Sequence, residues 1–416
     1  MAHKNINRFY PLFHLLLLLC TVYHRLYYRR FEIVGRGNIP KDKPVIFATC
    51  HQNALMDALA VIFAARRQIV FLARADIFKR KIIAGLLRFI RILPVYRKRD
   101  GYSSLSQNEE TFDEVNQVLK RRIPVGIFPE GLHLGMKKLK PLRKGIARMA
   151  FQAEAEADFM LGLQIVPVGL DYSDYYKAGS DLLVIFGRPI RVADYKEKYL
   201  QNQATGLNSL LDDLAAAMSE VMIDIRPEEE YEEILHGAEN YAKAEIKKQR
   251  LRDNLRNRFF LKKQITERIN HAYEEQPLVF KDLCNGMSSH RKTSPHNTEM
   301  DSESKGSAKI LWMSSHFLIA LLLFPLSLYG ALINLIPFLI TRKLAGKIRD
   351  PHFVSSVRFG LGFILFNLWY VILTLAIILF VNNIFLAIAL IISWPVSGWL
   401  TFYYFTFMKK FLTFQN

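Results

Sequence analysis

The apolar residues divide the chain into two regions. In the first, apolar and polar segments alternate, and in the C-terminal one most residues are apolar. Within the last hundred residues, Phe359–Val381 and Ile384–Phe407 contain no charged residue. Each run exceeds the roughly 20 helical residues needed to cross a hydrocarbon core of about 30 Å. We therefore predict that residues 310–416 form a membrane region in which 359–381 and 384–407 are spans.

The first apolar run of this region, Ile310–Ile340, is long for one span and short for two. It contains Pro325 and Pro337, and basic clusters follow both this run and the last one. The positive-inside rule places both clusters in the cytoplasm. If the preceding domain is also cytoplasmic, residues 310–340 must enter and leave on one side. We therefore predict a re-entrant hairpin that bends near Pro325 and Gly330.

A shorter apolar run, Phe9–Tyr23, lies near the N-terminus between basic residues. It lacks the small-residue cleavage site of a signal peptide. Residues 1–30 are predicted to form a membrane-associated helix that lies in the interface. The alternative is an ordinary helix docked on the next domain.

Short apolar runs alternate with helical patterns through the soluble-looking stretch that follows. The predicted strands are Pro44–Thr49, Gln68–Arg74, Ile92–Arg97, Pro124–Pro129, Gln164–Leu170 and Leu182–Phe186. The predicted helices are Ala54–Arg66, Ile77–Ile90, Gln107–Arg121, Lys144–Ala155 and Leu207–Ile225. This alternation predicts an α/β domain over residues 31–226, in which helices cover a sheet.

Two charged or polar segments connect this domain to the membrane region. Residues 227–284 are acidic at first and then strongly basic, with apolar residues at helical spacing in Lys243–Arg268. Such an amphipathic helix either lies on anionic lipid or packs back on the α/β domain. Residues 285–309 are rich in polar residues without periodicity, which predicts a flexible linker.

Composition narrows the class of protein. The chain has 416 residues, 51% of them hydrophobic, and a formal net charge of +18. A disordered chain and a small disulfide scaffold are excluded. A basic protein binds nucleic acid or an anionic membrane surface, and the apolar runs favour the membrane. Three widely separated cysteines, Cys20, Cys50 and Cys284, indicate a reducing, cytoplasm-facing environment.

One candidate for catalysis follows the first buried strand. That strand ends at Cys50, His51 comes next, and Asp57 follows six residues after the histidine. A histidine at a strand end can serve as a general base when a carboxylate fixes its tautomer. Alone, such a pair is a weak signal.

Three further short motifs follow or contain strands. They are Leu93–Arg97 (LPVYR), Phe128–Gly131 (FPEG) and Ile165–Gly169 (IVPVG). Because proline is unwelcome in a central ladder, Pro167 predicts a bulge or an edge strand.

In this order and spacing, the four motifs resemble those of the PlsC-type glycerolipid acyltransferases. The resemblance covers residues 39–192 and includes Lys144–Arg148, which is similar to the family's lysine–glycine helix start. It implies a glycerol-3-phosphate acyltransferase-like domain of the α/β class, with a mixed sheet flanked by helices. The order of parts, with an N-terminal apolar segment and C-terminal membrane helices, resembles the yeast-type glycerol-3-phosphate acyltransferases.

The resemblance also implies roles for individual residues. His51 would take the proton of the acceptor hydroxyl and Asp57 would orient it. The hydroxyl would attack the thioester of acyl-CoA or acyl-carrier protein, so neither a metal nor another cofactor is expected. Arg97 would hold the acceptor phosphate through paired hydrogen bonds. The expected pocket residues are Pro129, Glu130, Gly131, Lys144 and Pro167.

Two departures from the family pattern stand out. Five residues separate His51 from Asp57 where the family usually has four, so the pair meets only if His51 precedes the helix. After Gly131 the family often has Thr-Arg-Ser, whereas this chain has Leu-His-Leu. A basic cluster follows and could replace the missing arginine, or could be a solvated surface: Lys137, Lys138, Lys140, Arg143 and Lys144.

The sequence thus predicts an integral membrane O-acyltransferase whose catalytic domain faces the cytoplasm. Its expected partners are membrane lipids, acyl-CoA or acyl-carrier protein, and glycerol 3-phosphate or its monoacyl form. Nucleic acid is not expected as a partner, and the oligomeric state stays open. The alternatives are a lysophospholipid remodelling enzyme and a non-catalytic lipid-binding scaffold. A transporter is disfavoured because the spans lack buried charge.

Overall fold

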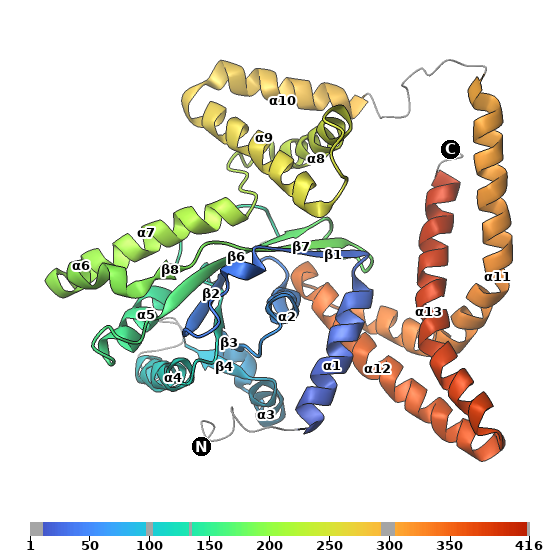
Figure 1. The fold of residues 1–416 in the computed structure, drawn as a ribbon, viewed down its shortest axis with the longest axis horizontal. Helices are drawn as coiled ribbons and strands as arrows, with labels where there is room; N and C mark the ends of the chain where they lie inside the picture. The colour runs from blue at the N-terminus through green and yellow to red at the C-terminus, as the bar shows by residue number, and fades with distance from the viewer. Residues whose placement is uncertain (1–10, 97–102, 133–134, 293–303, 414–416) are drawn as a thin grey trace. The chain divides into compact units, whose positions relative to one another are not determined.

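The chain forms two compact units in a computed structural model, which describes residues 11–96, 103–132, 135–292 and 304–413 (Figure 1). Unit 1 comprises Met1–Lys292 and unit 2 comprises Thr293–Asn416. Unit 1 contains a sheet with flanking helices, and unit 2 consists of long apolar helices. The predicted α/β class with a mixed sheet is confirmed.

The sheet of unit 1 is eight-stranded, with the order β1-β7-β6-β2-β5-β3-β4 and β8 paired to β6. Most neighbours are parallel, but β6 runs antiparallel to β7 and β8. The strands are β1 Arg30–Val34, β2 Val45–Thr49, β3 Val70–Arg74, β4 Ile92–Val95, β5 Val125–Ile127, β6 Gln164–Tyr172, β7 Asp181–Phe186 and β8 Ile190–Arg191. Every residue of β2 and of β7 is buried, as expected for continuous apolar strands covered on both faces.

Helices of unit 1 connect these strands and cover the sheet (Figure 1). The α-helices are α2 Ala54–Ala65, α3 Lys81–Phe89, α4 Ser103–Lys120, α5 Gly145–Ala155, α6 Lys196–Gln201 and α7 Gln203–Val221. Short 3-10 helices occur at Arg36–Asn38, Ala75–Phe78 and Val192–Tyr195. Each predicted strand and helix has a counterpart, with its ends moved by a few residues.

The edge strand β1 was not predicted, because Arg30 and Glu32 interrupt its apolar residues. In the structure both charged side chains have partners. Arg30 forms an ion pair with Asp181 of β7, with nitrogen and oxygen 2.6 Å apart. Glu32 accepts a hydrogen bond of 3.1 Å from the backbone N–H of Leu255.

Pro167 was predicted to mark a bulge or an edge. The edge is wrong, because β6 is an inner strand, whereas the interrupted pairing beside Pro167 agrees with an irregularity of the bulge kind. On one side Pro167 is in register with Ala48 of β2. On the other side, β8 pairs with β6 up to Ile165 and β7 pairs from Val168 onward. The proline, which lacks an N–H donor, therefore lies where one partner strand gives way to the next.

Residues 231–292 form three helices that pack against the sheet of unit 1, where they contact β7. They are α8 Tyr231–Lys248, α9 Leu255–Glu275 and α10 Pro277–Lys292. Ile234, Phe259 and Ile265 share a buried cluster with Leu183 and Ile185 of β7. Of the two interpretations of the basic amphipathic segment, the structure thus shows the one in which it packs back on the α/β domain.

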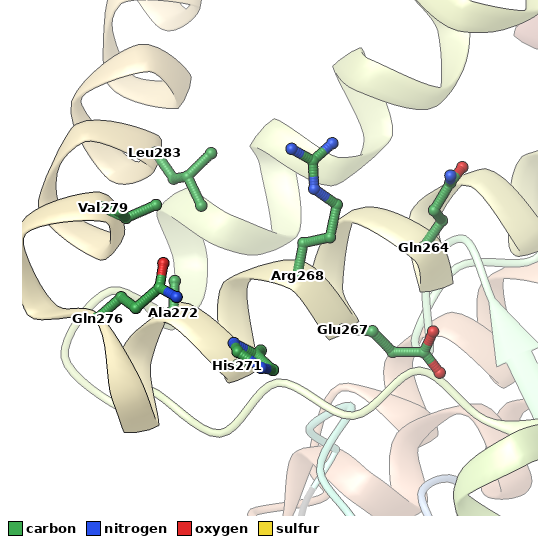
Figure 2. Close-up of a pocket in the computed structure, with 8 residues that line it drawn as sticks. All are labelled: Gln264, Glu267, Arg268, His271, Ala272, Gln276, Val279 and Leu283. Carbon is green, nitrogen blue, oxygen red and sulfur yellow. The ribbon is translucent and has the colours of Figure 1, made fainter.

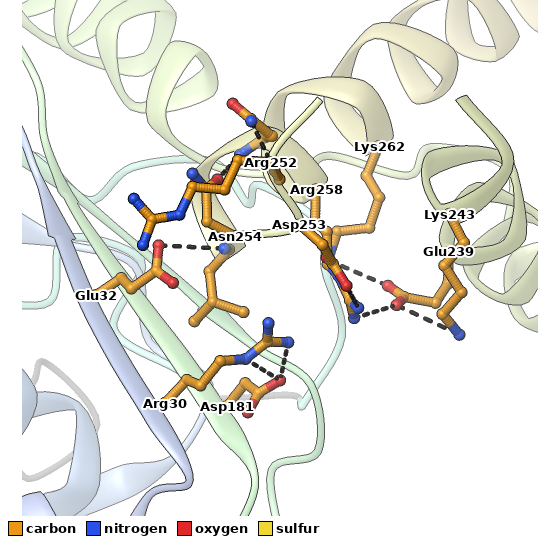
Figure 3. A network of polar contacts seen from close by, with 12 residues as sticks. Arg30, Glu32, Asp181, Glu239, Lys243, Arg252, Asp253, Asn254, Arg258 and Lys262 are labelled. Atoms are coloured by element: carbon orange, nitrogen blue, oxygen red, sulfur yellow. Dashed lines mark hydrogen bonds and ion pairs between the residues drawn. The ribbon is translucent and has the colours of Figure 1, made fainter. Parts of the chain in front are cut away.

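Polar contacts also join these helices to the sheet, as Figure 3 shows for β1, β7, α8 and α9. A shallow pocket of about 500 Å³ lies along α9 and α10 (Figure 2). Its lining residues are Gln264, Glu267, Arg268, His271, Ala272, Gln276, Val279 and Leu283. None of these residues belongs to the four motifs, so the pocket is separate from the predicted site.

The N-terminal helix α1, Pro11–Tyr27, docks on the α/β domain along one face. The ring of Phe13 meets that of Phe89 edge-on at 5.9 Å, and His24 is buried against Phe63. The opposite face exposes apolar residues, among them Leu15, Leu18 and Val22. The structure thus shows a helix docked on the α/β domain, and contact of its exposed face with a membrane stays a prediction.

Unit 2 contains α11 Ser304–Ala345, α12 Pro351–Phe380 and α13 Ile384–Thr413. All three helices are long and apolar enough to cross a membrane. The predicted hairpin over 310–340 is wrong, because α11 is one helix that contains Pro325 and Pro337. A proline removes one backbone hydrogen bond and bends a helix without reversing it.

Gly330 is used for helix packing rather than for a turn. A side chain there would lie 2.4 Å from the carbonyl oxygen of Ser397, so its absence lets α11 and α13 approach. One turn later, Asn334 donates to Trp394 O at 3.2 Å and accepts from the Tyr370 hydroxyl at 2.7 Å. A buried amide thus joins all three helices.

The predicted linker over 285–309 is helical at both ends. Helix α10 continues to Lys292, and α11 begins at Ser304. Phe280 and Leu283 pack against the buried cluster of α8 and α9. Once a helix is anchored in this way, adding residues at its end costs little free energy, because the helix is already nucleated. Residues 293–303 lie outside the described residues.

Candidate active site

His51 lies in the loop between β2 and α2, beside a buried carboxylate. Its Nδ1 is 3.0 Å from Oδ2 of Asp57, whose side chain is fully buried, while 16% of the histidine side chain is exposed. Helix α2 begins only at Ala54, so His51 precedes it. The six-residue step from His51 to Asp57 is therefore taken partly by the loop, and the two side chains meet.

Asp57 is held by four donors. Its Oδ2 accepts from the backbone N–H groups of Gln52 and Asn53 at 2.8 and 2.7 Å, as well as from His51. Its Oδ1 accepts from the hydroxyl of Tyr172 at 2.8 Å. The carboxylate therefore fixes both the turn that carries the histidine and the histidine ring itself.

The contact with Asp57 determines which ring nitrogen of His51 carries the proton. Because the carboxylate only accepts, Nδ1 carries the proton and Nε2 is the basic nitrogen. The ring also stacks on Phe128, with centroids 3.9 Å apart and planes 18° apart. Two of the predicted motifs thus meet at this ring.

Glu130 is a second titratable group beside the histidine. It is 3% exposed, and its Oε1 accepts from the His51 backbone N–H at 3.3 Å. Burial raises the pKa of Glu130 to about 7, although hydrogen bonds from the backbone of His51 and Lys140 and the charge of Lys140 oppose the rise. The carboxyl group therefore changes charge near neutral pH.

Glu130→Gln should remove a pH-dependent cost of folding. A carboxyl group whose pKa rises on folding stabilises the protein below its unfolded pKa, and that stability is lost as pH rises through about 7. We expect Glu130→Gln to have a higher melting temperature relative to wild type at pH 8 than at pH 5. Thermal unfolding in detergent at both pH values, with the exposed Glu229→Gln as control, measures this. An equal difference at both pH values would contradict it.

The FPEG motif closes a turn that brings the following loop back. Gly131 has a φ of +70°, and its N–H donates to Phe128 O at 3.1 Å. The N–H of Arg143 donates to Pro129 O at 2.8 Å. Pro129 and Gly131 therefore shape the turn around Glu130, and the basic cluster starts from this turn.

The lysines of the basic cluster differ in what their side chains contact. The ammonium of Lys137 is buried against Asp171, and that of Lys138 pairs with the exposed Glu228 at 2.6 Å. Lys144 is exposed and precedes α5. Lys140 lies beside Glu130, on which its backbone N–H and its charge both act.

Two predicted site residues remain, Pro167 and Arg97. Pro167 is part of β6, next to β2, and its carbonyl accepts from Gly187 N at 2.9 Å. Arg97 lies outside the described residues, and β4 ends two residues before it.

Sequence reasoning missed three residues that hold the site. They are Tyr172, which binds Asp57, and Gln52 and Tyr175, whose side chains are joined by a 2.7 Å hydrogen bond. Tyr175 also accepts from the Asn53 side chain through its carbonyl at 2.8 Å. The available signal was position, because Tyr172 ends the strand that contains the IVPVG motif.

Comparisons with known proteins identify a family model and several similar chains. Residues 30–171 match the family model described as Acyltransferase. Glycerol-3-phosphate O-acyltransferase 2 of Saccharomyces cerevisiae is 34% identical over 121 residues, which are 29% of this chain but only 16% of the yeast protein. The 1-acyl-sn-glycerol-3-phosphate acyltransferase of Bacillus subtilis is 25% identical over 39% of this chain and 75% of its own length.

Two further matches belong to the same group. The 1-acyl-sn-glycerol-3-phosphate acyltransferase alpha of Mus musculus is 28% identical over 39% of this chain and 52% of its own length. The crystal structure of the 1-acyl-sn-glycerophosphate acyltransferase PlsC of Thermotoga maritima covers 48% of this chain and 79% of that chain, at 17% identity and a TM-score of 0.34.

The matched segment indicates the class: residues 30–171 of unit 1 are similar to the acyltransferase family. The named relatives are glycerol-3-phosphate and 1-acylglycerol-3-phosphate acyltransferases.

Proposed function

We propose that this protein is a membrane-bound O-acyltransferase of phosphatidic acid and phospholipid synthesis. It transfers a fatty acyl chain from acyl-CoA or acyl-carrier protein to a hydroxyl of glycerol 3-phosphate or 1-acylglycerol 3-phosphate. The observation that carries the proposal is the His51–Asp57 pair, 3.0 Å apart and next to Glu130, within an acyltransferase-family domain.

The reaction follows from the orientation of the ring. Nε2 of His51 takes the proton of the acceptor hydroxyl while the hydroxyl oxygen attacks the thioester carbonyl. The tetrahedral intermediate collapses, the C–S bond breaks, and the imidazolium returns the proton to the thiolate. Asp57 accepts from Nδ1 throughout and stabilises the imidazolium. The thioester is already activated, so these steps need no metal.

The nature of the acceptor is supported by charge and by relatives. The chain carries a net charge of +18, and glycerol phosphates, CoA and the cytoplasmic leaflet are anionic. The similar proteins are named for glycerol 3-phosphate and for its 1-acyl form. Three long apolar helices support location in a membrane, and the cytoplasmic orientation of unit 1 stays a prediction.

The strand order sets a condition on Arg97. The parallel strands β2, β5, β3 and β4 present their carboxyl ends at one edge of the sheet, with β4 three positions from β2. Three inter-strand spacings are about 14 Å. Arg97 can bind the phosphate of a small acceptor at His51 only if the chain after β4 returns toward β2.

Arg97→Lys tests this role. Lysine keeps the charge but loses the two parallel hydrogen bonds of a guanidinium. We expect the KM for glycerol 3-phosphate to rise by about tenfold, the effect of one charge-assisted hydrogen bond, while the KM for acyl-CoA stays unchanged. An unchanged acceptor KM in steady-state assays would remove Arg97 from the phosphate site and favour the basic loop after Gly131.

One assay tests the function as a whole. Purified protein is incubated with radiolabelled palmitoyl-CoA or palmitoyl-acyl-carrier protein. The acceptors, tested separately, are glycerol 3-phosphate, dihydroxyacetone phosphate, 1-acylglycerol 3-phosphate and lysophosphatidylcholine, and the lipid products are resolved. Product from either glycerol phosphate supports the proposal. Product from lysophosphatidylcholine alone would show a remodelling enzyme, and the absence of product with any acceptor and either donor would contradict acyl transfer.

A further inference from the structure

An ion-pair network lies on the opposite face of β6 from Tyr172, the residue that binds Asp57. Asp171 of β6, whose side chain is 9% exposed, lies between the ammonium groups of two buried lysines, Lys137 and Lys262. Its Oδ2 is 2.7 Å from Nζ of Lys262. Burial alone would raise the pKa of Asp171, but the two lysines hold it at about 2. The carboxylate is therefore charged throughout the physiological pH range.

Asp171 is the strand neighbour of Tyr172, the residue that binds Asp57. Consecutive residues of a strand point to opposite faces of the sheet, so the two side chains act on opposite sides of one backbone segment. Nζ of Lys137 also donates to Tyr172 O at 3.1 Å. Contacts that fix Asp171 therefore also fix the backbone from which Tyr172 reaches Asp57.

Lys262 comes from α9, outside the residues that match the family model. Figure 3 shows it next to Glu239 of α8, and its Nζ is 3.6 Å from that carboxylate. Glu239 in turn lies 3.4 Å from Arg258, which binds Asp253. Burial alone would lower the pKa of Lys262, but Asp171 and Glu239 raise it. The network thus places a permanent positive charge of α9 against β6.

We propose that Lys262 is a positioning residue for the His51–Asp57 pair. By holding Asp171, it fixes the end of β6 so that the Tyr172 hydroxyl stays on Asp57. The helical segment α8–α10 is then part of what makes the site competent and not a separate appendage. This inference rests on the proposed acyl transfer for its kinetic test, but not for its structural test.

Lys263 offers a matched control on the same helix. Its Nζ donates to Ser219 O at 2.6 Å and pairs with Glu267 at 2.7 Å, so it also attaches α9 to the α/β domain. These contacts attach Lys263 to the end of α7 and to its own helix, and not to β6. A merely structural role for Lys262 predicts that Lys262→Met and Lys263→Met have similar consequences.

The structural test uses backbone hydrogen exchange of the full-length protein in detergent. The N–H groups of Gln52 and Asn53 are protected by Asp57. We expect peptides that cover residues 51–57 to exchange roughly tenfold faster in Lys262→Met, because local opening becomes easier. We expect wild-type exchange there in Lys263→Met. Wild-type exchange in both variants would overturn the inference, whether or not the protein has the proposed activity.

The kinetic test separates positioning from binding. We expect kcat of Lys262→Met to fall between about 10-fold and about 100-fold, the cost of a small displacement of catalytic groups. Both KM values should change less than kcat does. In a Tyr172→Phe background, Lys262→Met should cause no further loss, because both changes interrupt the same connection.

Several results would overturn the proposal. They are an unchanged kcat in Lys262→Met of an active enzyme, an equal loss in Lys263→Met, and full additivity with Tyr172→Phe. If Lys262→Met does not fold, Lys262→Gln keeps a donor for Asp171 and should give an intermediate increase in exchange at residues 51–57. Wild-type protein without turnover would contradict the proposed function alone, and the exchange result would still decide the role of Lys262.

Discussion

Replacing His51 with alanine is expected to lower kcat by roughly 10²–10⁴-fold, the range that general-base catalysis contributes. The reason is geometric. Asp57 fixes the proton on Nδ1, and Phe128 holds the ring from one face, so Nε2 is the basic nitrogen at this site. Turnover of acyl-CoA with each acceptor measures the effect.

The alanine variant should keep its fold. The His51 side chain is partly exposed, and the backbone N–H that binds Glu130 remains. Melting temperature and size-exclusion profile should therefore match wild type. Near-wild-type activity of a folded His51→Ala protein on every acceptor would show that another group takes the proton.

Asp57→Asn is expected to have the second large effect, up to about 10⁴-fold in kcat, as when an orienting carboxylate becomes an amide. An asparagine oxygen can still accept from the N–H groups of Gln52 and Asn53, so the turn before α2 can persist. That same oxygen would face His51 Nδ1, and the NH₂ group would take the place of Oδ1 beside Tyr172. The imidazole is then held by a neutral acceptor, and the negative charge that stabilises the imidazolium is lost.

The two functions of Asp57 predict different outcomes. If the carboxylate served only to hold the turn, Asp57→Asn would melt near wild type and keep its kcat. If it orients the imidazole, kcat falls although the melting temperature changes little. Steady-state kinetics and thermal unfolding of the same preparation separate these cases.

Sequence patterns predicted the interior of the sheet because its strands are continuous apolar runs. They missed β1, since its charged side chains find partners far along the chain: Asp181 for Arg30 and the N–H of Leu255 for Glu32. They left Pro167 at either a bulge or an edge, because the exchange of β8 for β7 along β6 leaves no local signal.

The site divides in the same way. The motifs located His51, Asp57 and Glu130, and the structure brings these three together. The supporting contacts of Tyr172 and Lys262 depend on pairs separated by about a hundred residues, and no spacing rule reaches so far. The hairpin over 310–340 failed because proline predicts a bend, whereas a reversal needs a loop.

The two-sided character of α1 has a consequence for how the protein can be divided. Leu15, Leu18 and Val22 are exposed on α1, and Ile82 and Leu86 are exposed on α3, which α1 meets through Phe13 and Phe89. These side chains belong to unit 1 and remain when residues 293–416 are deleted. Truncation before α11 would therefore yield a fragment with an exposed apolar surface, and detergent would still be needed to keep that fragment soluble.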